Sequence, residues 1–139
     1  MKNLIIAAAM GGLVMTSGCA STFSEAAAPE AAAATPVNLV IMYTLKEGVT
    51  PADFEAWVAE TDHPTMRALE SVDDFRTYRA EGLLMGEGAP SVTYIETFAI
   101  GDMEGFTTVD MAGEAVQTIT GQFMGFAEAP QFILVTELE

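Results

Sequence analysis

Two kinds of hydrophobic repeat follow each other along residues 37–139, and their order limits the fold more than any other feature. Val37–Leu45 alternates and is rich in β-branched and aromatic side chains, which predicts a strand. Thr50–Asp53 reads Thr-Pro-Ala-Asp, a helix start with threonine as N-cap and proline at the first helical position. One stripe of a helix follows at i, i+3, i+4 and i+7, formed by Phe54, Trp57, Val58 and Thr61.

The next segment is expected to leave this helix and to form a hairpin. Pro64 should interrupt the helix, because proline lacks the N–H that a helix interior needs, and residues 65–69 should form a separate turn. Phe75–Met85 and Val92–Ile100 are two further strand candidates. Gly86–Pro90 between them has loop chemistry, so the two strands are predicted to pair as a hairpin.

The remainder of the chain adds one helix and one strand. Asp102 can cap a short helical turn around Met103–Phe106. An amphipathic helix follows, and its apolar stripe is Ala115, Val116, Ile119, Phe123 and Phe126. Phe132–Thr136 is the predicted final strand. The order βαββαβ predicts an α+β domain with a ferredoxin-like fold, whose helices cover one sheet face and leave the other for a partner or a ligand.

Charge and composition exclude several classes of function. The chain has 139 residues, which suits one domain, and it carries 20 acidic and 5 basic residues for a formal charge of -15. Such a surface repels phosphate backbones, so nucleic acid is not an expected partner. With one cysteine, one histidine and no calcium-loop spacing of acids, the sequence predicts neither an internal disulfide nor a metal site.

The N-terminal part of the chain is predicted to export the domain rather than to join its core. Residues 1–18 have a basic start, an apolar run from Leu4 to Met15 and small residues before Cys19, as in a secretory signal peptide. The apolar run is shorter than the roughly 20 residues that a transmembrane helix needs. Residues 20–36 are rich in alanine and proline and have no apolar face, which indicates a flexible spacer.

Ser17-Gly18-Cys19 resembles the lipobox of bacterial lipoproteins, in which the cysteine becomes the lipidated first residue. Thr16 departs from the pattern, where the family prefers leucine. The resemblance implies that residues 19–36 are a lipidated cysteine and a tether, with enough acyl chains for stable anchoring. Ala20, where a retention signal would place aspartate, favours the periplasmic face of the outer membrane. The alternative is cleavage within the alanines, which would release a free periplasmic protein.

A glutamate in an apolar strand is the best candidate for a functional side chain. Tyr94 and Glu96 share one face of the third predicted strand, and a carboxylate there is costly unless it is paired or reaches water. Glu96 is therefore the expected pocket-facing carboxylate, with Arg76 as its partner. A solvated glutamate or a structural ion pair would leave the same pattern, so both interpretations stay open.

His63 is the second candidate, because histidine is the side chain whose unperturbed pKa suits proton transfer near neutral pH. It follows Asp62 at the expected end of the first helix, where a histidine can equally be a cap or a surface residue. The three tyrosines on the strands are candidate hydrogen-bond donors to a ligand: Tyr43, Tyr78 and Tyr94.

Four segments resemble the REDY-like/HapK group of dimeric α/β-barrel proteins. In matching order and spacing, they are WVAETDHPTMRAL at 57–69, FRTYR at 75–79, YIE at 94–96 and GFAEAPQFILV at 125–135. The resemblance covers essentially all of 37–139. It implies a homodimer that packs its open sheet faces together and a small-molecule pocket in each copy, often without a cofactor. It implies no role for His63, since an apolar residue is expected there.

Three functions remain open on the sequence. The first is an exported dimeric barrel that binds a small apolar or aromatic molecule as a cofactor-independent enzyme. Glu96 or His63 would then be the acid and base, the tyrosines would donate hydrogen bonds, and Arg76 would orient the ligand. The second is a non-catalytic envelope lipoprotein that binds a ligand or a protein, which export away from biosynthetic intermediates favours. The third is a haem- or oxygen-handling barrel, as in some structural cousins.

Replacing Cys19 by serine tests the lipid anchor. The wild-type chain is expected to incorporate radioactive palmitate in the producing cell, and Cys19→Ser is expected to lose that label because acylation starts from the thiol. The measurement is autoradiography of the precipitated protein. Equal labelling of both forms would contradict the anchor and leave only the export signal.

Overall fold

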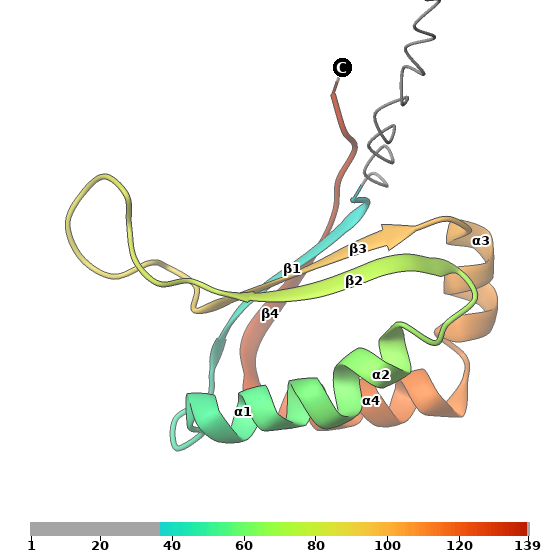
Figure 1. Cartoon of the computed structure of the whole chain (residues 1–139), viewed down its shortest axis with the longest axis horizontal. Helices are drawn as coiled ribbons and strands as arrows, with labels where there is room; N and C mark the ends of the chain where they lie inside the picture. Colours follow the sequence, from blue (N-terminus) through green and yellow to red (C-terminus); the bar gives the residue numbers. More distant parts are fainter. Residues whose placement is uncertain (1–36, 139) are drawn as a thin grey trace, which may run out of the picture. The chain divides into compact units, whose positions relative to one another are not determined.

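The computed structural model describes residues 37–138, which form a four-stranded antiparallel sheet with helices on one face (Figure 1). The strands, in the spatial order β2-β3-β1-β4, are β1 (Leu39–Leu45), β2 (Val72–Arg79), β3 (Tyr94–Ile100) and β4 (Ala127–Leu134). The helices are α1 (Pro51–Trp57), α2 (His63–Met66), α3 (Met103–Gly105) and α4 (Glu114–Phe126), with π-helical turns at Val58–Asp62 and Phe106–Asp110. The predicted α+β ferredoxin-like fold is confirmed.

The first helix begins as predicted but does not end at Pro64. Thr50 accepts a hydrogen bond from the backbone N–H of Asp53 at 3.2 Å, which caps α1. The chain then stays helical through Met66, so the predicted interruption is wrong. A proline ring clashes with the carbonyl four residues earlier in a regular helix. Here the preceding turn is π-helical, with the N–H of His63 bonded to the carbonyl of Val58, and the helix continues through its wider turn.

The predicted hairpin exists, but its strands are shorter than expected on the loop side. β2 ends at Arg79 rather than at Met85, and β3 begins at Tyr94 rather than at Val92. Ala80 and Thr93 close the ladder with a backbone hydrogen bond of 2.8 Å, and the loop between them extends away from the sheet (Figure 1). The apolar residues that suggested a longer strand are exposed at this loop: Leu83, Leu84 and Met85. Hydrophobic character alone therefore overextended the strand.

The second half of the domain matches its predicted elements, with one boundary shifted. Asp102 caps α3 by accepting from the N–H of Gly105, as predicted. The buried residues of α4 are Val116, Ile119 and Phe123, from the predicted stripe. β4 follows α4 directly at Ala127 and ends at Leu134, whereas the prediction placed it at 132–136. Pro130 lies inside β4, an edge strand, where a missing N–H donor is tolerated.

The core lies between the sheet and the helices and is rich in aromatic rings. Tyr43 of β1 is fully buried, with its ring centroid 4.9 Å from that of Phe123 on α4 and 5.9 Å from that of Phe54 on α1. Phe75 of β2 stacks on Phe98 of β3 at 4.3 Å. These contacts fix the helices over alternate residues of each strand, because successive strand side chains point to opposite faces.

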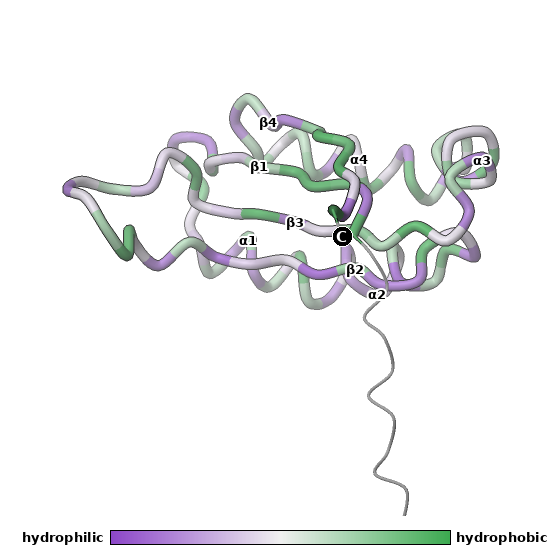
Figure 2. The backbone as a smooth tube through the Cα atoms, turned by 90° about the horizontal axis from the view of Figure 1, so that it is seen from above, coloured by the Kyte–Doolittle hydropathy of each residue, from purple (hydrophilic) through white to green (hydrophobic). Residues whose placement is uncertain are grey.

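The other face of the sheet has no covering element among the described residues (Figures 1 and 2). Its central and β4 positions carry half-buried apolar side chains, which include Val40, Met42, Ile95 and Ile133. Toward β2 the face becomes polar, with Arg76 and Tyr78 exposed. None of the helices in the described part of the chain is long and apolar enough to cross a membrane.

Candidate functional site

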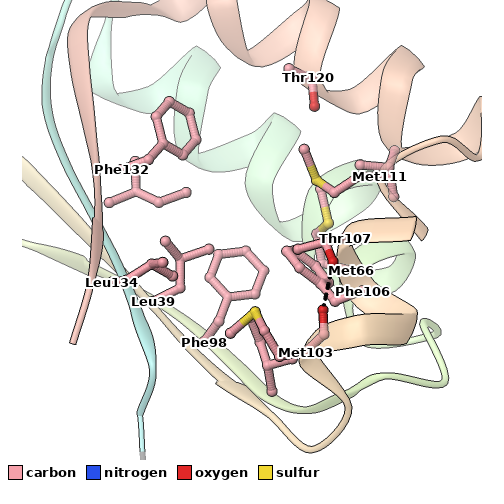
Figure 3. Close-up of a pocket in the computed structure, with 13 residues that line it drawn as sticks. Leu39, Met66, Phe98, Met103, Phe106, Thr107, Met111, Thr120, Phe132 and Leu134 are labelled. Atoms are coloured by element: carbon pink, nitrogen blue, oxygen red, sulfur yellow. Dashed lines mark hydrogen bonds between the residues drawn. The ribbon is translucent and has the colours of Figure 1, made fainter. Parts of the chain in front are cut away.

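The main cavity of the domain lies between the sheet and the helices α3 and α4 and has a volume of about 460 Å³ (Figure 3). Its sheet wall is formed by Leu39, Ile41, Phe98, Ile100, Phe132 and Leu134. Its helix wall is formed by Met66, Met103, Phe106, Met111 and Val116. The cavity exists because β4 is an edge strand that α4 does not fully cover, so Leu134 stays 72% exposed at the opening.

The cavity offers a ligand almost no polar contact. Thr107 and Thr120 are its only lining residues with a polar side chain. The hydroxyl of Thr107 donates to the carbonyls of Met103 and Glu104, at 2.9 and 3.2 Å. Thr120 points from α4 toward the other lining residues (Figure 3). Such a surface suits an uncharged, largely apolar molecule, because a charged group would lose its hydration without gaining a partner.

Glu96 is buried on the helix side of the sheet, only 3% exposed. Its Oε1 accepts a hydrogen bond of 2.6 Å from the hydroxyl of Tyr43 on the neighbouring strand. Burial, together with the nearby charge of Asp62, raises the pKa of Glu96 to about 8, although the bond from Tyr43 acts in the opposite direction. Burial and the Glu96 carboxylate in turn raise the pKa of Tyr43. Glu96 can therefore hold a proton at neutral pH.

Asp62 is a site residue that the sequence interpretation missed. It is 3% exposed, it makes no capping hydrogen bond, and its Oδ2 has no hydrogen-bond partner among the described residues. Burial raises its pKa to about 7, partly offset by the charge of Arg67. The signal was available, since Phe54, Val58 and Asp62 recur every four residues and all three are buried. The expectation that Pro64 ends the helix hid that repeat.

The two carboxyl groups lie in the partition between the main cavity and a second, polar pocket. Along the sheet, Glu96 is paired on one side with Ile41, which lines the main cavity, and on the other with Thr77, which lines the polar pocket. Along the helix, Asp62 lies four residues from Val58 of the polar pocket and four from Met66 of the main cavity. Neither carboxyl lines either cavity itself.

The polar pocket, of about 360 Å³, places His63 and Tyr94 beside charged side chains. The Nε2 of His63 lies 3.1 Å from the hydroxyl of Thr77, and burial followed by the charge of Arg67 lowers the pKa of His63. The hydroxyl of Tyr94 donates to Glu55 at 2.8 Å, and burial is the main reason that the pKa of Tyr94 rises to about 12. Arg79 also reaches Glu55, at 2.8 Å.

The predicted pairing of Arg76 with Glu96 is wrong. Phe75 and Thr77 point toward the helices, so Arg76 and Tyr78 point to the open face. Arg76 instead pairs with Asp74 at 2.6 Å on the exposed surface. The six candidate residues thus divide in two: Tyr43, His63, Tyr94 and Glu96 lie on the helix side, and Arg76 and Tyr78 lie on the open face. Cys19 lies outside the described residues.

No group of three or more metal-ligating side chains is brought together within residues 37–138. The candidate chemistry of the site is therefore described by its carboxyl, phenol and imidazole groups. These can hold a proton, donate one or accept one.

Comparison with known proteins places the fold and the family. The family model described as "REDY-like protein HapK" matches residues 37–138. The crystal structure of HapK from Hahella chejuensis is 25% identical, with a TM-score of 0.58 over 73% of this chain and 92% of that one. No curated protein sequence matches the chain.

Two further solved structures share the fold alone. Protein At3g17210 from Arabidopsis thaliana is 16% identical, with a TM-score of 0.62 over 75% of this chain and 97% of that one. A dabb family protein with a ferredoxin-like fold from Mesorhizobium loti is 13% identical, with a TM-score of 0.56 over 74% and 97%.

The buried acids predict how stability depends on pH. Their ordinary pKa values are 3.8 for Asp62 and 4.5 for Glu96, and folding raises these to about 7 and about 8. Between about pH 4 and pH 8 the folded state binds more protons than the unfolded chain, so the free energy of unfolding falls as pH rises. The loss across this window should be on the order of a few kcal/mol.

Urea unfolding at pH 5 and pH 8.5 measures this loss. The double variant Asp62→Asn, Glu96→Gln should lose much less stability between the two values, because it removes both titrating groups. Glu60→Gln, which removes an exposed acid from the same helix, should keep the wild-type difference. If the double variant loses as much stability as the wild type, the buried acids do not carry the pH dependence.

Proposed function

The chain belongs to the REDY-like HapK family, and we propose that its folded domain binds a small, uncharged apolar or aromatic molecule between the sheet and the helices. The observation that carries this proposal is the cavity of about 460 Å³ whose walls are apolar apart from two threonine hydroxyl groups. The volume lies within the usual range for small-molecule sites. An anionic ligand is disfavoured, because the chain carries a net charge of -15 and the cavity lining contains no cation.

Acid–base chemistry is the catalytic extension of this binding. Glu96 is protonated at neutral pH and is held by Tyr43, so it can act as a general acid toward a bound ligand. His63, with a lowered pKa, is the neutral base nearest to it on the side of the polar pocket. In this form the domain is a cofactor-independent enzyme that moves protons on its ligand.

Binding without catalysis is the second candidate, and one observation favours it. Glu96 does not line the cavity, although its neighbours Ile41 and Phe98 do. A ligand in the cavity as it stands would meet these apolar side chains rather than the carboxyl. Catalysis requires them to move aside, whereas a carrier or sensor function does not.

A homodimer through the open sheet face belongs to the same proposal. Four apolar side chains, Val40, Met42, Ile95 and Ile133, lie on that face, half-buried and without a covering element among the described residues. A sheet that is apolar on both faces needs a second layer on each. A second copy supplies such a layer and gives the barrel that the family resemblance implies.

Export and lipid anchoring of the domain complete the proposal. They are supported by the signal-like residues 1–18 and by Cys19 in a lipobox-like sequence. The spacer joins the domain at Val37, two residues before Leu39 of the cavity wall. A tethered domain would therefore meet molecules of the cell envelope rather than those of the cytoplasm.

Binding of the neutral dye Nile red to the Cys19→Ser chain tests the cavity. Thr120→Phe should lower the affinity by at least about tenfold, because the ring occupies the space of the ligand. Thr118→Phe on the same helix is the matched control, since Thr118 is exposed and lies outside the cavity lining. Fluorescence titration measures both. Equal binding by the two variants would show that the dye does not use this cavity.

The dimer is tested by native mass spectrometry of the same Cys19→Ser chain. The wild-type face should give a dimer, and Ile95→Glu should give a monomer because it places a charge in the apolar interface. Thr118→Glu adds the same charge on the helix side and should leave the dimer intact. A dimer that survives Ile95→Glu would move the interface away from the open face. The same spectra report any ligand retained from the producing cell.

A further inference from the structure

Asp62 is the feature of the site that the fold does not explain. A buried carboxyl without a hydrogen-bond partner is costly, and buried polar groups are almost always bonded. The position faces the sheet between Val58 and Met66, both buried, where an apolar side chain would serve the core. A residue that weakens the fold in this way is a candidate for function.

No cation neutralises this carboxyl or Glu96 within the described part of the chain. Arg67 is the cation that acts on Asp62, but its Nε and Nη2 both donate to the carbonyl of Phe75, at 3.0 and 2.9 Å. Arg79 pairs with Glu55 and Glu81 instead. The titratable and charged groups around the two acids are Tyr43 from β1, Tyr94 from β3, Arg79 from β2, and Glu55, His63 and Arg67 from the helical segment and its end.

Asp62 and Glu96 also lie close enough to affect each other. His63, next to Asp62, contacts Thr77, and Thr77 is the strand partner of Glu96. The charge of Asp62 is one cause of the raised pKa of Glu96. Two carboxyl groups in a shared apolar site do not both ionise easily, because each charge opposes the other and neither is hydrated.

We propose that Asp62 and Glu96 form one acid–base pair that holds a single proton near neutral pH, with Asp62 as the positioning residue that keeps Glu96 protonated. The pair lies in the partition between the apolar cavity and the polar pocket, so one side faces the ligand wall and the other the solvent-accessible groups. This inference rests on the proposed function only for the identity of the proton acceptor.

The proton balance of the pair is simple. When Glu96 acts as an acid, its O–H bond breaks and the proton forms a bond to a basic atom of the ligand. Glu96 then becomes a carboxylate beside the charge of Asp62, which favours rapid reprotonation. Solvent supplies that proton through the polar pocket, where His63, Thr77 and Tyr94 carry exchangeable protons. The ligand gains one proton, solvent loses one, and the pair returns to its starting state.

Carboxyl ¹³C NMR titration of the full Cys19→Ser chain, labelled at aspartate and glutamate, tests the pair without any ligand. The Glu96 signal, assigned by its loss in Glu96→Gln, should titrate with a midpoint near 8 in the otherwise wild-type chain. In Asp62→Asn, which keeps the side-chain shape, the midpoint should fall by at least about one unit toward 4.5. Glu60→Gln should leave it unchanged, since that acid is exposed.

Two results would overturn the pair: a Glu96 midpoint near 4.5 in the wild-type background, or an unchanged midpoint in Asp62→Asn. If Asp62→Asn does not fold, the reciprocal measurement decides. The Asp62 midpoint should fall from about 7 toward 3.8 in Glu96→Gln, and no fall would equally overturn the pair. Nile red binding separates this inference from the proposed function. Shifted midpoints without dye binding in the cavity support the pair and contradict the ligand site, and the reverse outcome supports the site alone.

Discussion

The hydrogen bond between Tyr43 and Glu96 joins the two central strands on the face that the helices cover. It places a carboxyl where the fold otherwise buries rings, and the surrounding structure is arranged around that group. Tyr43 is itself held between Phe54 and Phe123, so the phenol cannot turn away from the carboxyl without disturbing both helix contacts. The two elements that cover the sheet are thereby coupled to the protonation of one side chain. A neutral Glu96 suits this environment, whereas a charged one would oppose the packing that surrounds it.

The cavity and the polar pocket differ because the two edges of the sheet are covered differently. At the β4 edge, α4 leaves apolar side chains around an open space. At the β2 edge, Arg79, Glu55 and Tyr94 are linked by hydrogen bonds across the gap between strand and helix. An apolar molecule and a proton would therefore approach the same partition from opposite sides. This separation limits water in the ligand space while keeping the acids in contact with exchangeable groups.

Much of the fold could be predicted because strands and helices leave local signals. The N-cap at Thr50, the cap at Asp102 and the apolar stripe of α4 all follow from short-range rules. The errors arose where a local rule met a tertiary exception. Pro64 is a helix breaker by composition but lies in a continuing helix, and the Leu83–Met85 run is apolar but belongs to an exposed loop.

For the site, alternation along a strand correctly grouped Tyr94 with Glu96, yet it could not give the register between strands. Thr77 rather than Arg76 is the partner of Glu96, so the expected ion pair does not form. Asp62 was missed because its burial depends on a helix that continues past the point where proline normally stops it.

The π-helical turn at Val58–Asp62 has a consequence for how this chain tolerates changes in length. A π-turn holds one more residue than an α-turn, so deleting a residue there would convert it to a regular turn and rotate everything that follows by about 100° about the helix axis. Met66 would leave the cavity wall, and His63 would leave Thr77. The extra residue thus acts as a spacer that sets two functional surfaces of one helix in phase, and its number of residues is constrained more tightly than their identity.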